Sequence, residues 1–260
     1  MTRTPPDTVG KTAGAESFPV ATRFLGRRAR AVRAFYRWAR AADDIADDPR
    51  LAPDTRLAQL DALEADLPAD LPGREHLRNL LVAFRRDALD GPCPDWPALM
   101  DSCAWSAVPV GRFLLDLYGV TDGRAVAASD ALCSALQVLN HVQDAGRDQR
   151  ILGRSYVPAD WLADEGLTPA ALAEPAASPA VRRVLNHTVG GGEDLLARAR
   201  PLPRLVPGGL RRQAAATLVY AGRLARNLRR ADPLAGRVGL TRGDRLAALG
   251  AALFPGRRRS

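Results

Sequence analysis

Four aspartates lie within six residues of each other in the segment RWARAADDIADD (37–48). On a helix, at about 100° per residue, one face roughly 60° wide carries Tyr36, Arg40, Asp43 and Asp47. Asp44 and Asp48 crowd the same helix end, where like charges repel and negative charge opposes the helix dipole. Such a cluster indicates a bound cation that neutralises the carboxylates.

A second polar stripe occurs about 100 residues later, in ALQVLNHVQDAGRD (135–148). A helical face about 80° wide carries Gln137, Asn140, Asp144 and Asp148, and the opposite side carries Leu132, Leu136, Leu139 and Val142. A solvated helix face more naturally carries Glu and Arg than Gln, Asn and Asp, which are mediocre helix formers. The stripe therefore indicates a polar site rather than bulk solvent.

Two helices with carboxylates at i and i+4 can face each other across a bundle and hold hard cations. Magnesium typically takes one or two carboxylates, keeps several waters and completes its shell with substrate phosphates. Arg40, one turn before Asp43, adds a phosphate partner. A single DxxxD motif is more often a solvated acidic patch, but two of them on amphipathic helices favour a magnesium and phosphate site.

The elements that position these side chains are all helical in pattern, with no alternating strand signal. Helices are predicted at 28–48, 54–66, 74–90, 97–118, 125–150, 179–199, 209–230 and 241–254. Proline- and glycine-rich segments predict connections at 67–73, 91–97, 168–179 and 200–209. We expect a disordered polar leader at 1–15 and one all-α domain over 16–260.

The composition excludes several classes of protein. Hydrophobic residues make up 47% of the 260 residues, which is ordinary for a globular chain. No apolar run is long enough to span a bilayer, and the start lacks a signal peptide. The three cysteines (Cys93, Cys103 and Cys133) have no metal-ligand spacing, so a reducing, cytoplasmic setting is expected.

At this point a family resemblance is apparent. The chain resembles the head-to-head trans-isoprenyl diphosphate synthases, the squalene and phytoene synthase family, from about Glu16 to its C-terminus. The motifs that carry this resemblance are ESFPVATRFL (16–25), ARAADDIADD (39–48), SAVPVGRFLLDLYG (106–119), ALQVLNHVQDAGRDQRILGRSYVP (135–158) and QAAATLVYAGRLARNL (213–228). The resemblance implies a helical bundle of the isoprenoid synthase type around one central cavity.

The resemblance also implies roles for individual residues. The predicted magnesium ligands are Asp43, Asp47, Asp144 and Asp148, with Asp44 in support. Tyr156 is placed with these aspartates in the catalytic set, near the diphosphate. The predicted substrate-binding residues are Ser17, Phe18, Tyr36, Arg40, Gln137, Asn140, Arg147 and Arg154. The apolar remainder of the cavity is expected to be lined by Phe18, Phe35, Phe113 and Leu136, although plain core packing also accounts for each of them.

Within the family, the chain looks most like the hydroxysqualene synthase branch, on its Phe-Pro-Val-Ala opening and on Gln143 before Asp144. That branch implies ionisation of presqualene diphosphate and capture of the cation by water, with no nicotinamide cofactor. The alternative in this class is a synthase that condenses two prenyl diphosphates, such as farnesyl diphosphate, to squalene, presqualene diphosphate or phytoene. Two residues depart from the pattern of the relatives. Ser102 stands where they generally carry a tyrosine, and Val108 stands where this branch commonly carries an asparagine.

Three further features of the sequence are a histidine beside the second stripe, a run of glycines and the C-terminal arginines. His141, beside the second stripe, is interpreted as a helix-surface histidine. Gly190–Gly192 indicates either a close helix approach to a prenyl tail or a helix interruption. The C-terminal arginines predict weak, peripheral attachment to the inner face of an anionic membrane, although GC-rich codon bias explains them equally well. Other enzymes of the squalene and hopanoid pathway are possible partners.

Two classes of protein outside this family are less well supported. The formal charge of +8 invites a nucleic-acid-binding interpretation. However, 36 of the 37 basic residues are arginines spread over the whole chain, and only 5% of residues are aromatic, so no nucleic acid is expected as a partner. A di-iron bundle would need a Glu-x-x-His motif on its helices, and the sequence has none.

Overall fold

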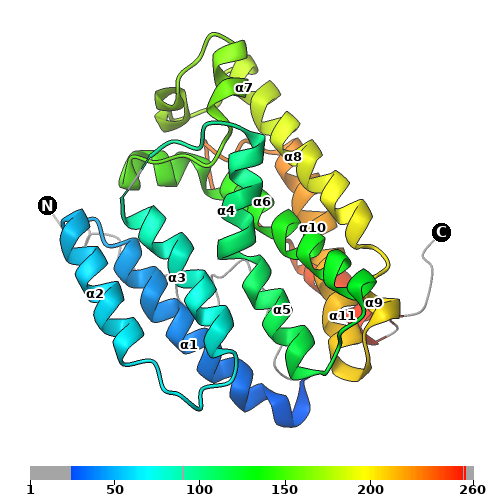
Figure 1. The fold of residues 1–260 in the computed structure, drawn as a ribbon. Coiled ribbons are helices and arrows are strands. Elements are labelled where there is room, and N and C mark those ends of the chain that lie inside the picture. Colours follow the sequence, from blue (N-terminus) through cyan, green and yellow to red (C-terminus); the bar gives the residue numbers. More distant parts are fainter. Residues whose placement is uncertain (1–24, 90, 254, 256–260) are drawn as a thin grey trace, which may run out of the picture.

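The computed structural model describes residues 25–89, 91–253 and 255. These residues form helices and no strands, as predicted (Figure 1). The longer helices are α1 (Ala29–Ala46), α2 (Pro53–Ala65), α3 (Arg74–Ala88), α4 (Trp96–Ser106), α5 (Val108–Leu117), α6 (Gly123–Leu152), α8 (Pro179–Ala199), α10 (Gly208–Arg230) and α11 (Arg242–Leu253). Short turns of helix are η2 (Gly26–Arg28), α7 (Ala159–Asp164), η3 (Pro169–Ala173) and α9 (Leu202–Leu205).

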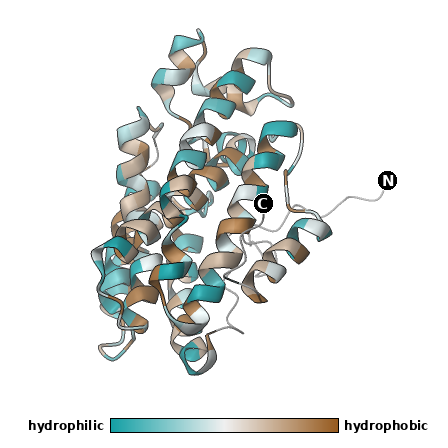
Figure 2. Ribbon diagram, turned by 90° about the vertical axis from the view of Figure 1, so that its right-hand side faces the viewer, coloured by the Kyte–Doolittle hydropathy of each residue, from teal (hydrophilic) through white to brown (hydrophobic). Residues whose placement is uncertain are grey.

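The central element is α6, a helix of 30 residues. One apolar cluster joins α6 to α4, α8 and α10, with Leu136 and Leu139 fully buried in it. A second cluster joins α1, α2 and α3 to part of α5, around Phe35 and Phe113. Figure 2 shows that most helices carry both hydrophobic and hydrophilic residues, as expected of amphipathic helices that each bury one side.

The observed helices differ from the predicted ones in four places. The helix predicted at 97–118 is two helices, which meet at Ala107. Pro109 explains this break, because proline has no N–H for the helical ladder and its ring clashes with the carbonyl four residues earlier. Helix α1 ends at Ala46, so Asp47 is its C-cap rather than an interior residue. The connections predicted at 168–179 and 200–209 contain η3 and α9.

The glycines at 190–192 do not interrupt α8, so that alternative was wrong. A Cβ atom added at Gly191 would lie 2.3 Å from the ring of Trp96. The glycine therefore permits close packing of α8 on an aromatic side chain of α4. It lines neither of the two cavities described below.

The expected leader at 1–15, together with Ser17 and Phe18, lies outside the described residues. None of the described helices has the length and apolar character needed to cross a bilayer.

Candidate active site

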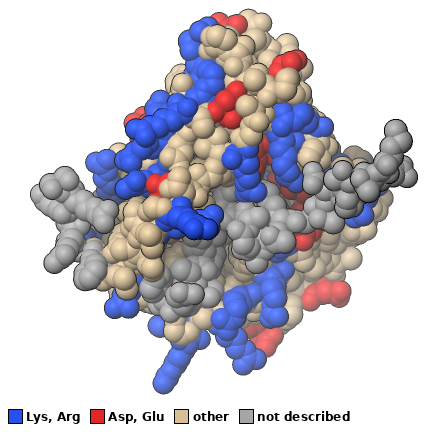
Figure 3. Space-filling model, turned by 180° about the vertical axis from the view of Figure 1, so that it is seen from behind, with Lys and Arg blue, Asp and Glu red and all other residues tan. Residues whose placement is uncertain are grey.

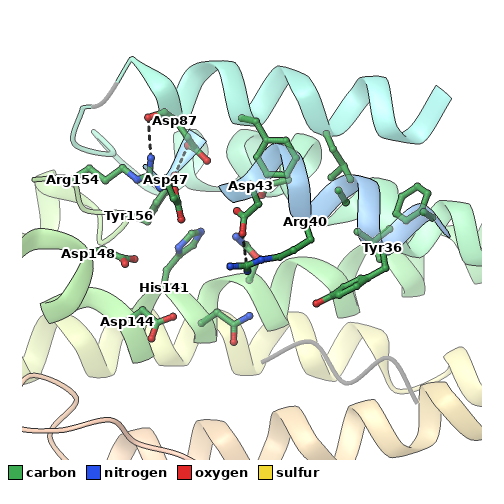
Figure 4. A pocket seen from close by; sticks show the side chains of 18 residues that line it. Tyr36, Arg40, Asp43, Asp47, Asp87, His141, Asp144, Asp148, Arg154 and Tyr156 are labelled. Atoms are coloured by element: carbon green, nitrogen blue, oxygen red, sulfur yellow. Dashed lines mark hydrogen bonds and ion pairs between the residues drawn. The ribbon is translucent and has the colours of Figure 1, made fainter. Parts of the chain in front are cut away.

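A polar cavity of about 230 Å³ lies between α1, α3 and α6 (Figure 4). From α1 it is lined by the face that the first stripe predicts, namely Tyr36, Arg40, Asp43 and Asp47. This face is presented to the cavity because Ala42 and Ala46, on another side of the same helix, are fully buried in the core. The first acidic cluster therefore faces the inside of the bundle.

From the other side the same cavity is lined by the second predicted stripe of α6, namely Gln137, Asn140, Asp144 and Asp148. Asp144 is buried, with 8% of its surface exposed. Helix α6 keeps this orientation because its opposite side, with Leu132, Leu136 and Leu139, packs in the main core. The two aspartate-bearing helices thus share one central cavity, as predicted.

The third side of the cavity is formed by the segment that follows α6, and Gly153 sets the direction of that segment. This glycine ends α6 in the left-handed conformation, with φ of 67°, which glycine adopts without steric cost. The chain then turns back, so that Arg154 and Tyr156 also line the cavity. Both were predicted site residues, although their positions outside any helix gave no periodicity from which to place them.

Arginines partly neutralise the acidic cluster. Arg40 donates to Asp43 at 3.1 Å and to Asp44 at 2.6 Å, and Arg154 forms an ion pair with Asp47. Arg147 lies 3.7 Å from Asp148. All three predicted phosphate-binding arginines are therefore paired with carboxylates of the two motifs. Asp44 and Arg147 line a smaller neighbouring cleft rather than the central cavity.

Asp87, at the end of α3, is a cavity residue that the sequence analysis missed. The hydroxyl of Tyr156 donates to its carboxylate, and Arg154 donates to its backbone carbonyl at 2.9 Å (Figure 4). Burial raises the pKa of Tyr156 well above its usual range, and the charge of Asp87 raises it further. Burial on its own lowers the pKa of Arg154, but Tyr156, Asp87 and Asp47 raise it above its usual value. At neutral pH the phenol is thus protonated and the guanidinium charged.

The interpretation of His141 as a surface histidine was wrong. The side chain is buried, lines the cavity and stacks on Tyr156 with the ring centroids 3.8 Å apart. Phe84 and Ser106 also line the cavity and were not predicted. No spacing marks these three residues, because each comes from a helix whose apolar periodicity alone does not distinguish a cavity wall from the core.

An apolar cavity extends along α5 and α6 beside the polar one. Val110 and Gln137 line the polar cavity, and their chain neighbours Gly111 and Leu136 line the apolar one. Phe35 lines the polar cavity and stacks on Phe113 at 4.1 Å, but Phe113 lines neither cavity. Ser102 and Val108, the two residues that depart from the family pattern, also line neither cavity.

The residues present suit a hard divalent cation. The donors that line the cavity are the carboxylates of Asp43, Asp47, Asp144 and Asp148, the oxygen ligands that magnesium prefers. Among the residues that the structure describes, no three acidic, histidine or cysteine side chains are close enough to hold one ion by themselves. Magnesium typically takes one or two protein carboxylates and draws its other ligands from water and phosphate.

Comparisons with known proteins agree with this geometry. Residues 69–244 match the family described as squalene/phytoene synthase. Hydroxysqualene synthase of Rhodopseudomonas palustris is 39% identical over 89% of this chain and 85% of its own. That of Sinorhizobium fredii is 37% identical over 87% of this chain and 84% of its own. The crystal structure of squalene synthase HpnC from Alicyclobacillus acidocaldarius is 33% identical, with a TM-score of 0.72 over 82% of this chain and 88% of that one.

An all-α bundle with paired aspartate motifs on facing helices defines this protein as an isoprenoid synthase, an enzyme class that acts on prenyl diphosphates. The family match covers more than half of the chain, and the relatives exceed 30% identity over most of it. The chain belongs to the squalene/phytoene synthase family. A dehydrosqualene synthase solved with a ligand shares the fold, with a TM-score of 0.79 at 22% identity.

Proposed function

We propose that this enzyme converts presqualene diphosphate to hydroxysqualene with magnesium, as the resemblance to hydroxysqualene synthases suggests. The observation that carries the proposal is the polar cavity with two facing aspartate pairs, in a chain 39% identical to a hydroxysqualene synthase. The alternative within the family is condensation of two prenyl diphosphates to squalene, presqualene diphosphate or phytoene, since phytoene synthases are also relatives, at 31% identity.

In the proposed reaction the carbon–oxygen bond to diphosphate breaks, and both electrons leave with the diphosphate. The oxygen of a water molecule then bonds to the carbocation and loses a proton to solvent or to a basic group of the site. Carbon is neither oxidised nor reduced by an external agent, so no nicotinamide cofactor is needed. Magnesium, when bound, supplies positive charge that stabilises the departing diphosphate.

The described residues suit these steps. Arg40 and Arg154, now paired with Asp43 and Asp47, lie where a diphosphate could replace the carboxylates as their partner. Asp43, Asp47, Asp144 and Asp148 would hold the metal, and Gln137 and Asn140 extend the same polar wall. Tyr156 is oriented by Asp87 and by its stack on His141. An apolar cavity of about 40 Å³ lies along α5 and α6, and it would have to widen to hold the prenyl chains of the substrate.

We also propose a cytoplasmic enzyme that attaches weakly to the inner face of the membrane, with other enzymes of squalene and hopanoid synthesis as possible neighbours. Its prenyl substrate and product partition into lipid, which supports such attachment. Nucleic acid is not proposed as a partner, because the cavity presents carboxylates that repel phosphate unless a metal is bound.

The test is incubation of the full chain with magnesium and either presqualene diphosphate or farnesyl diphosphate, followed by gas chromatography and mass spectrometry. Hydroxysqualene from presqualene diphosphate, carrying oxygen-18 when the reaction runs in labelled water, supports the proposal. Squalene or phytoene made directly from prenyl diphosphates would favour the alternative. Release of diphosphate from neither substrate would refute both.

A further inference from the structure

Helix α11 exposes its leucines and buries its small residues. Leu246, Leu249 and Leu253 are 68%, 43% and 55% exposed. The residues that α11 buries are Asp244, Ala248 and Ala252. Five large apolar side chains are exposed in the part of the chain that the structure describes, and three of them are these leucines. At about 100° per residue they form one stripe roughly 60° wide, whose centre lies about 110° around the helix from the buried alanines.

The orientation of this helix is set by specific hydrogen bonds, so the stripe is not a consequence of loose packing. Asp244 accepts hydrogen bonds from Arg223 at 3.2 Å and Asn227 at 3.1 Å, both on α10. It also accepts one from the hydroxyl of Thr241 at 2.9 Å. These contacts hold the first turn of α11 against α10, beside which the helix lies in Figure 1. The leucines therefore face away from α10.

Arginines lie at both ends of the stripe and along one of its edges. Arg242, which falls in the same helical arc as the leucines, and Arg245 are both exposed on α11. At the other end, Pro255 lines a surface hollow with Arg211 and Arg212 of α10. Helices α10 and α11 together contain eight arginines and one acidic residue, the buried Asp244. On the rear face of the molecule, basic side chains outnumber acidic ones (Figure 3).

We propose that α11 lies in the interface of an anionic lipid membrane, with its leucine stripe in the acyl region and its arginines at the headgroups. This deepens the proposed membrane attachment and names the surface that makes it. An apolar stripe flanked by arginines is typical of helices that lie in a membrane plane. A nucleic acid would use the arginines but not the leucines. In a two-fold dimer through this stripe, each end of α11 would face arginines of the other copy. The repulsion between these like charges opposes such a dimer.

The test is co-sedimentation of the full chain with vesicles of phosphatidylcholine alone or mixed with phosphatidylglycerol. The wild type is expected to bind the mixed vesicles at least about tenfold more tightly than the neutral ones, and salt should weaken that binding. The triple variant Leu246→Ser, Leu249→Ser, Leu253→Ser should lose at least about tenfold in binding to mixed vesicles. Leu89→Ser, which changes another exposed leucine of this chain, should bind as the wild type does.

Circular dichroism and gel filtration accompany each variant, and the exposed positions should leave the helical content unchanged. The proposal is overturned if the triple variant binds mixed vesicles as well as the wild type, or if the wild type binds neither vesicle. It is also overturned if the wild type is a dimer that the triple variant converts to a monomer. Vesicle binding needs no substrate, so its failure is separable from a failure to form hydroxysqualene.

Discussion

Arg154 forms an ion pair with Asp47, a residue 107 positions earlier in the sequence. The contact ties the C-terminal end of α1, which carries the first aspartate motif, to the segment that follows α6, the helix of the second motif. Arg154 is 6% exposed and also donates to the carbonyl of Asp87 on α3. One guanidinium therefore connects three elements that build the site.

Replacing this guanidinium should cost stability as well as activity. We expect Arg154→Gln to lower the free energy of unfolding by about 1–3 kcal/mol, because the carbonyl of Asp87 and the half-buried carboxylate of Asp47 lose their partner. Arg154→Lys should retain only part of the stability that Arg154→Gln loses, since an ammonium group cannot make the several directed hydrogen bonds of a guanidinium. Urea unfolding measures the change. Arg50→Gln, which breaks an exposed pair with Asp48, is the control and should cost much less stability than Arg154→Gln. Equal losses for both variants would contradict the prediction.

The aspartates of the two motifs should be needed for turnover but not for folding. We expect Asp43→Asn and Asp144→Asn each to reduce turnover by at least about a hundredfold at saturating magnesium, because each removes a charged metal ligand. Asp43→Asn should change stability by less than about 1 kcal/mol, since its pair with Arg40 is partly exposed and lies within an acidic cluster. Asp101→Asn, in an exposed pair with Arg86 outside the cavity, serves as the control. A near wild-type rate in either motif variant would show that the aspartate is not a ligand.

Magnesium and diphosphate should stabilise the protein together more than separately. A ligand that binds only the folded state raises stability by RT ln(1 + [L]/Kd), or about 1.4 kcal/mol at ten times Kd. We expect inorganic pyrophosphate with magnesium to raise the melting temperature, and EDTA to remove that increase without unfolding the protein. Asp144→Asn should abolish most of the shift. An equal shift with pyrophosphate alone would mean that the arginines bind it without a metal.

The docking of α11 should weaken in acid. Hydrogen bonds from Asn227 and Thr241 lower the pKa of Asp244 from its ordinary 3.8 to about 2. A carboxyl whose folded pKa is depressed contributes stability that is complete above its unfolded pKa and is lost as the pH falls through the folded one. The stability difference between wild type and Asp244→Asn should therefore be constant above about pH 5 and should shrink towards pH 2. Thermal unfolding at a series of pH values measures it, and a difference that does not change with pH would refute the assignment.

Two adjacent glycines of α8 should respond oppositely to alanine. Gly191→Ala places a methyl group against Trp96, so we expect a loss of about 1–3 kcal/mol from overpacking. At Gly190 the nearest atom to an added Cβ is a guanidinium nitrogen of Arg229 at 3.5 Å, an ordinary contact. Gly190→Ala should therefore be neutral or stabilising by up to about 1 kcal/mol, as in other helix interiors. Denaturant titration of the two variants compares them directly, and equal losses would show that the Trp96 contact is unimportant.

Much of the site follows from the sequence because helical periodicity is local. The positions of Tyr36, Arg40 and Asp43 on one face of α1 depend only on 3.6 residues per turn, and the C-cap Asp47 continues that face. The same holds for Gln137, Asn140, Asp144 and Asp148 on α6. The sequence therefore predicts an all-α bundle with two acidic helix faces, and the family resemblance, rather than periodicity, implies that both faces share one cavity.

The remaining contacts depend on how elements distant in the sequence pack, and no local pattern encodes that packing. Asp87 becomes a site residue only because α3 ends beside the turn that carries Arg154 and Tyr156. His141 is buried because Tyr156 stacks on it, not because of its own helix position. The exposure of the α11 leucines is likewise not encoded locally, since a hydrophobic pattern predicts burial of Leu246 and Leu249. The hydrogen bonds of Asp244 to α10, together with the burial of Ala248 and Ala252, turn that face outward.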